Sequence, residues 1–148
     1  MNRPIIHLHF RQLEDINEHG QKTYPEECCG FLFGTEVGNE RVIHEVVPID
    51  NSRQDNKERR FLITPEDFLE AERRAENLDL NLIGFYHSHP DHPAIPSEFD
   101  REHALPFYSY VILSVRNRKP AEIRSYQLAD DRESYCEEKL IIHQRVAI

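Results

Sequence analysis

The sequence predicts an α/β (α+β) domain in which a mixed, curved β-sheet is flanked by helices. Short apolar runs rich in β-branched and aromatic residues are interleaved with two segments of helical periodicity. No internal repeat or low-complexity tract interrupts them, so the elements fit one layered domain. With 148 residues the chain has the length of a single domain, residues 1–148, which buries about 70% of the surface of its unfolded form.

Two segments have the pattern of amphipathic helices. The pattern is weak over residues 11–22 and strong over residues 65–77. The second helix has a complete start signal, because Thr64 can cap it, Pro65 suits its first position and Asp67 can close a capping box. Its apolar stripe, expected to pack on the sheet, consists of Phe68, Ala71, Ala75 and Leu78.

The strands are expected where short apolar runs end at glycine, proline or polar turns. The residues around Gly38 predict a hairpin between two of them. Residues 51–59 are almost wholly charged or amide and predict a polar loop. The expected strands are residues 4–10, 28–34, 41–49, 61–63, 82–86, 108–115, 121–128 and 140–142.

Composition excludes several classes of function. A net charge of −9 argues against a nucleic-acid partner, because phosphate binding needs a concentrated basic surface. No apolar run approaches the roughly 20 residues that span a bilayer, and the first residues lack the apolar stretch of a signal peptide. The three cysteines are odd in number and two are adjacent, so we expect free thiols and a cytoplasmic location.

The clearest candidate site begins where the apolar run 82–86 ends. His87 and His89 are two residues apart on the expected strand, so their imidazoles point to the same side. Two converging imidazoles suit zinc, and Asp100 can supply a third ligand across a proline-rich loop, leaving one position open for water. A second pair, His7 and His9, has no nearby ligand in the sequence, and we expect it to lie on the polar face of an early strand.

Two further residues complete a candidate catalytic set. Ser97 and Asp100 have the spacing of a capping box, and a helix that starts at Ser97 would hold Asp100 rigidly in its first turn. A zinc-activated water needs a nearby group that takes its proton and delivers it to the leaving amine. Glu27 is the candidate, because it stands at the entrance of an apolar strand, although such a residue is more often a surface acid.

The signatures of two families of zinc hydrolases match residues of this segment. Residues 87–92 satisfy the His-x-His-x-Asp-His pattern of metallo-β-lactamase-fold hydrolases. Those domains need more chain and further ligands downstream, whereas only His103 and His143 follow His92.

The second family accounts for more residues. The sequence resembles the JAMM (MPN-plus) metallopeptidases, whose signature is an upstream glutamate followed by His-x-His-Pro-x6-Ser-x2-Asp. Residues 25–34 are similar to the glutamate-bearing strand entrance of that family, with Glu27 on the glutamate, and the likeness extends over about residues 4–128. The fixed positions of the signature fall on His87, His89, Pro90, Ser97 and Asp100.

The resemblance implies a JAB/MPN-like, cytidine-deaminase-like fold and a zinc-dependent hydrolase of peptide or isopeptide bonds. It assigns one Zn²⁺ per chain to His87, His89 and Asp100, the general acid/base role to Glu27, and a hydrogen bond to the developing oxyanion to Ser97. Family members that lack ligands are non-catalytic binding modules, but here every ligand position is filled.

Small free-standing bacterial members of the family imply a particular substrate. They act on ubiquitin-like sulfur-carrier proteins, so we expect cleavage at the C-terminal Gly-Gly tail of such a carrier. Residues 51–60 are expected near that tail, with Arg60 and Phe61 as candidate contacts.

Overall fold

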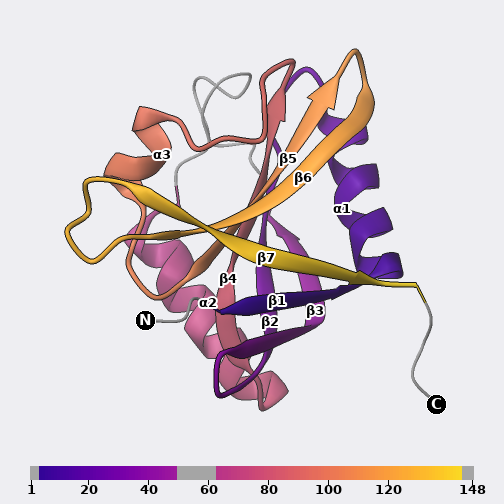
Figure 1. Cartoon of the computed structure of the whole chain (residues 1–148). Helices are drawn as coiled ribbons and strands as arrows, with labels where there is room; N and C mark the ends of the chain where they lie inside the picture. Colours follow the sequence, from indigo (N-terminus) through magenta and orange to yellow (C-terminus); the bar gives the residue numbers. More distant parts are fainter. Residues whose placement is uncertain (1–3, 50–62, 145–148) are drawn as a thin grey trace.

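The computed structural model describes residues 4–49 and 63–144, which form a closed β-barrel with three helices (Figure 1). The strands follow the order β1-β3-β2-β4-β5-β6-β7 around the barrel, and β1 pairs with β7 to close it. The helices are α1 (Phe10–Thr23), α2 (Pro65–Leu78) and α3 (Glu98–His103). The strands are β1 (Ile5–His9), β2 (Cys29–Val37), β3 (Glu40–Ile49), β4 (Asn81–Pro90), β5 (Ser109–Arg116), β6 (Lys119–Leu128) and β7 (Tyr135–His143).

Strand β4, which carries His87 and His89, lies between β2 and β5 in the sheet. It pairs antiparallel with β2 and parallel with β5, and His87 is the register partner of both Cys29 and Ile112. Successive residues of a strand point to opposite faces, and here both faces are covered, so residues 82–86 of β4 are apolar on both faces.

Two apolar cores lie on the two faces of the central strands. Tyr86 and Leu32 belong to the core that α1 covers, whereas Phe85 and Phe31 belong to the core that α2 covers. The α1 core includes Ile6, Leu8, Ile16, Ile83, Val111, Leu113 and Val115. The α2 core includes Phe33, Ala71, Ala75, Leu82, Tyr110 and Leu128.

Most of the predicted elements are present, with bounds shifted by a few residues. The capping box at Thr64 and Asp67 is formed, and a two-residue turn at Gly38 joins β2 to β3. Ile63, predicted to end a strand, lies in neither a strand nor a helix, and the rest of that prediction lies outside the described residues. The predicted loop at 51–59, and the contacts expected of Arg60 and Phe61, also lie outside them.

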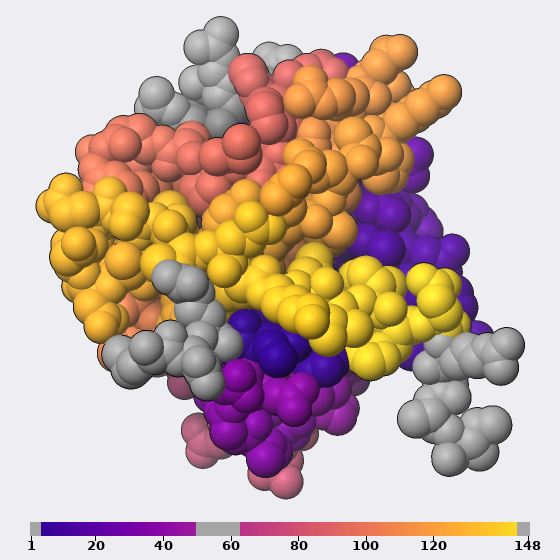
Figure 2. Space-filling view, viewed as in Figure 1, coloured from indigo at the N-terminus to yellow at the C-terminus, as the bar shows by residue number. Residues whose placement is uncertain are grey.

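The C-terminal strand differs most from its prediction. β7 extends over Tyr135–His143 rather than 140–142, and it pairs with β6 on one side and β1 on the other. Figure 2 shows it as a continuous band between these two strands. The expected curved sheet is thereby closed into a barrel, because pairing with β1 satisfies the backbone groups that an edge strand leaves open.

No helix of the described residues is long and apolar enough to cross a membrane.

Candidate metal centre

The end of β4 brings two buried imidazoles together. His87 and His89 are 9% and 7% exposed, and their Nε2 atoms lie 3.1 Å apart. Both follow Phe85 on the same face of the strand, as the two-residue period of a strand predicts. The convergence predicted from sequence is therefore present.

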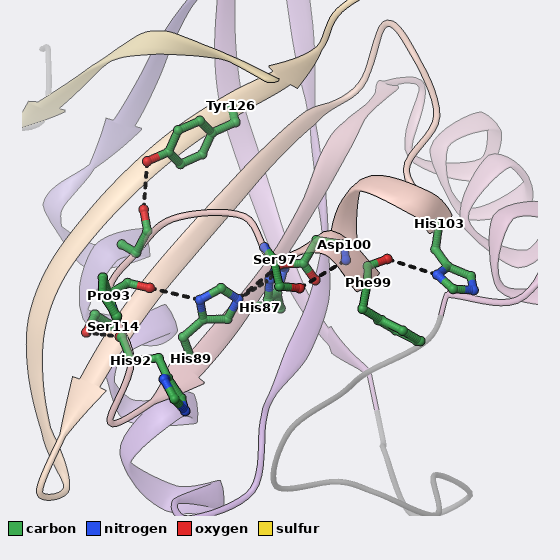
Figure 3. A network of polar contacts seen from close by, with 11 residues as sticks. His87, His89, His92, Pro93, Ser97, Phe99, Asp100, His103, Ser114 and Tyr126 are labelled. Carbon is green, nitrogen blue, oxygen red and sulfur yellow. Dashed lines mark hydrogen bonds and ion pairs between the residues drawn. The ribbon is translucent and has the colours of Figure 1, made fainter. Parts of the chain in front are cut away.

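Helix α3 adds a carboxylate to this pair. Asp100 Oδ2 lies 3.3 Å from His87 Nε2 and 3.1 Å from His89 Nε2 (Figure 3). Four ligands arranged tetrahedrally at about 2.0–2.1 Å from a zinc ion are about 3.3 Å from one another. The three atoms thus have the spacing of three corners of a zinc tetrahedron. In the described part of the chain, His87, His89 and Asp100 are the group of side chains that could hold a metal ion.

A short capping box positions Asp100. Its Oδ2 accepts the Ser97 N–H at 2.9 Å, and its own N–H donates to Ser97 Oγ at 3.0 Å. The helix start predicted at Ser97 is therefore formed. Because Ser97 Oγ acts as an acceptor in this pair, the hydroxyl hydrogen is left to donate to another group.

The Asp100 carboxylate is held in its ionised form. Burial opposes ionisation, but the charges and hydrogen bonds of His87 and His89 outweigh it and hold the pKa of Asp100 well below its ordinary value. An ionised carboxylate is the form that binds a metal ion.

Glu27 lies beside the cluster because β2 pairs with β4. The Cys28 N–H donates to Ser88 Oγ at 2.8 Å, and the Ser88 N–H donates to the Cys28 carbonyl at 3.1 Å. Strands β2 and β4 are antiparallel, and Cys29 is the partner of His87. The two bonds between Cys28 and Ser88 continue this pairing by one residue, so Glu27 comes to lie opposite His89. Glu27 also lines the same cavity as His89.

That cavity has a volume of about 480 Å³ and is lined by Glu27, His89, His92, Pro93, Ile95 and Ser97. Glu27 is only 4% exposed, and burial raises its pKa to about 9, with a smaller lowering by the charge of His89 and a raising by that of Asp100. At neutral pH the carboxyl therefore holds a proton in the metal-free protein. The arrangement places a proton-carrying group in an open cavity with His89, one of the three candidate metal ligands.

The other histidines do not join the cluster. His92 lines the cavity, with its ring directed away from the imidazole pair in Figure 3, and His103 Nδ1 bonds to the Phe99 carbonyl at 2.9 Å. His9 accepts the Arg11 N–H and caps α1, as a structural rather than metal-binding residue. His7 instead contacts Glu40 and His143, which the sequence does not place beside it.

The fold and the site together define a hydrolase of the JAMM class. The family model described as prokaryotic homologs of the JAB domain, Prok-JAB, matches residues 11–129. The chain belongs to this family. The metallo-β-lactamase alternative is thereby wrong. Its pattern uses His92 as a ligand, whereas the third side chain of the cluster in this structure is Asp100.

Relatives of known name agree with this assignment. A desampylase from Haloferax volcanii is 33% identical over 98 residues, which are 66% of this chain and 68% of the relative. A CysO-cysteine peptidase from Mycobacterium tuberculosis is 31% identical over 113 residues, or 76% of this chain and 75% of the relative. The solved structure of protein DSY2949 from Desulfitobacterium hafniense superposes with a TM-score of 0.81, at 31% identity, over 95% of this chain and 94% of that one. The protein is an isopeptidase-type hydrolase of the JAMM family.

Proposed function

We propose that this protein is a zinc-dependent peptidase that cleaves the amide bond at the C-terminal Gly-Gly tail of a ubiquitin-like or sulfur-carrier protein. The observation that carries the proposal is the placement of Glu27 in one cavity with His89 and Ser97, next to three ligand atoms at tetrahedral spacing. A peptide hydrolase needs those parts within reach of one carbonyl group.

The roles follow from the geometry of the side chains. His87, His89 and Asp100 would hold one zinc ion, which when bound polarises the scissile carbonyl and acidifies water. Glu27 would act in its ionised form, which the positive charge of a bound zinc ion favours: it takes a proton from the attacking water and, as the acid formed in this way, delivers it to the leaving amine. Ser97 donates its free hydroxyl hydrogen to the oxygen that becomes negatively charged.

The proposed substrate is supported by the shape of the cavity and by the relatives. Pro93 and Ile95 form apolar walls, with Ile95 59% exposed, and His89 presents the ligand cluster to the same cavity. A glycine tail has no side chains to clash with these walls, so its backbone can approach the ligands closely. The names desampylase and CysO-cysteine peptidase support a protein-conjugate substrate.

The test is hydrolysis of an adduct at the C-terminal Gly-Gly of a sulfur-carrier protein by the zinc-loaded full chain. We expect the wild type to cleave it, Glu27→Gln to retain zinc and lose at least about 100-fold in kcat, and the half-buried neighbour variant Glu26→Gln to behave as wild type. A zinc-loaded wild type that leaves a panel of such adducts intact would refute the substrate, and full activity of Glu27→Gln would refute the role of Glu27.

We place this activity in a single domain, residues 1–148, in the cytoplasm. Cys28 and Cys29 are buried and all three cysteines are free thiols, which supports a reducing compartment. Burial raises the pKa of the Cys28 thiol to about 12, so this cysteine is not a competing nucleophile.

A further inference from the structure

The loop between β4 and α3 has three successive carbonyl groups that each accept a hydrogen bond from a side chain (Figure 3). The His92 carbonyl accepts from Ser114 Oγ at 2.6 Å, and the Ala94 carbonyl accepts from the Tyr126 hydroxyl at 2.7 Å. Between them, the Pro93 carbonyl lies 2.9 Å from Nδ1 of His89. A metal-binding imidazole therefore bonds to the middle of three restrained peptide groups.

The two flanking donors come from rigid parts of the barrel. Ser114 is fully buried in β5 and is the register partner of His89 itself. Tyr126 is 7% exposed in β6 and packs with the fully buried Ala94. The middle peptide is held from the same sheet, since the Ala94 N–H bonds to Glu122 Oε1 at 3.3 Å. Loop peptide groups hydrogen-bonded to side chains of the sheet in this way have little freedom to rotate.

The orientation of the Pro93 carbonyl determines which nitrogen of His89 can bind a metal. A carbonyl only accepts hydrogen bonds, so Nδ1 of His89 must carry the ring hydrogen. With Nδ1 committed to the Pro93 carbonyl, Nε2 is the nitrogen left for a metal ion, and it faces His87 Nε2 and Asp100 Oδ2. Pro93 has no N–H of its own and a fixed φ, so the peptide groups on either side of it set the direction of its carbonyl.

We propose that Ser114 and Tyr126 are positioning residues of the metal site, which act through the loop backbone. By holding the His92 and Ala94 carbonyls they aim the Pro93 carbonyl at His89, and so fix Nε2 as the ligand atom before a metal arrives. This inference rests on the metal site of the proposed function, but on neither its substrate nor its reaction.

The test compares Ser114→Ala, Tyr126→Phe and the double variant with the wild type, each lacking only hydroxyl groups. The first readout is the tautomer of His89, from long-range ¹H–¹⁵N spectra of the zinc-loaded full chain, in which the metal takes the place of Asp100 as the partner of the second ring nitrogen. We expect Nδ1–H alone in the wild type and a mixture of tautomers in the double variant. The second readout is zinc affinity in competition with a chelator, where we expect a loss of about 10-fold or more.

Two matched controls separate positioning from general stability. Ser109→Ala removes a buried hydroxyl from the same strand, β5, where Ser109 Oγ accepts from Arg41. Ser125→Ala removes a buried hydroxyl from β6, the strand of Tyr126, where Ser125 Oγ donates to Glu138 Oε1 at 2.8 Å. We expect both to lower the melting temperature and to leave zinc affinity within about twofold of the wild type, since the hydroxyl partners are Arg41 and Glu138 rather than the loop at 92–94.

The outcomes distinguish this inference from the proposed function. The positioning role is overturned if the double variant keeps the wild-type tautomer and the wild-type zinc affinity. It is also overturned if the control variants lose as much zinc affinity as the double variant when their loss of stability is the same. If the wild type binds zinc but cleaves no carrier adduct, the proposed function fails while the tautomer and affinity shifts still support the positioning role.

Discussion

Replacement of Glu27 by glutamine should stabilise the metal-free protein at neutral and alkaline pH, although the same change removes the proposed acid/base. The Glu27 side chain is almost fully buried, and burial raises its pKa from an ordinary 4.5 to about 9. Between these two pH values the folded protein keeps the carboxyl proton and the unfolded chain loses it. Glutamine has a similar size and no proton to lose.

The sign and the magnitude follow from proton linkage. The folded state binds more protons than the unfolded state over this window, so the free energy of unfolding falls as the pH rises. The stabilising contribution is complete below pH 4.5 and is lost as the pH rises towards about 9. At about 1.4 kcal/mol per pH unit, the wild type should lose about 4 kcal/mol relative to Glu27→Gln between pH 5 and pH 8. This is a large part of the stability of an ordinary domain.

Urea unfolding in the presence of a chelator measures the effect directly. The difference in unfolding free energy between wild type and Glu27→Gln should widen steadily from pH 5 to pH 8, while the difference for Glu26→Gln should stay constant. Comparison of variants at each pH cancels the titration of all other groups. A Glu27→Gln difference that does not change with pH would refute the reasoning, because it would mean that the carboxyl is ionised in the folded protein.

The remaining predictions concern the ligands and the backbone around them. Asp100→Asn keeps an acceptor for the Ser97 N–H but loses the charge, so zinc affinity should fall more than about 100-fold in chelator competition. Ser97→Ala should lower kcat by about 10²–10³ in steady-state kinetics of the zinc enzyme, with KM nearly unchanged and about 1 kcal/mol lost from the cap of α3; unchanged kcat would exclude the oxyanion role. Gly84→Ala places a Cβ 1.8 Å from the Ser109 carbonyl oxygen across the β4–β5 pair and should cost about 3 kcal/mol or more in urea unfolding. Gly38→Ala has no neighbour within 4 Å but a φ of +61°, so its cost should be only about 1–2 kcal/mol, and equal costs would contradict the packing argument.

Removal of a bound metal tests the cluster as a whole. Addition of a chelator to the zinc-loaded wild type should abolish activity and lower the melting temperature, because a ligand that binds only the folded state stabilises it by mass action. Asp100→Asn should show no such thermal shift on addition of zinc.

Local sequence patterns were sufficient for most of the elements and for most of the candidate site. The period of a strand places His87 and His89 on one side, and the capping-box spacing places Asp100 in the first turn of α3; both depend only on neighbours within a few residues. The position of Glu27 was inferred from its place at a strand entrance and from the family signature, since sixty residues of chain separate it from the histidines.

The tertiary structure decided what depends on partners distant in the chain. The pairing of β2 with β4 brings Glu27 to the ligands, and the burial that results, rather than any local pattern, raises its pKa. The bonds of Ser114 and Tyr126 to the loop carbonyls have no signal in the sequence, because any residue supplies a carbonyl and only packing selects which one is reached. The closure of the barrel by β1 and β7 likewise joins the two ends of the chain. Periodicity specifies which face of a strand is buried, whereas the choice of its partner strand depends on how the whole chain packs.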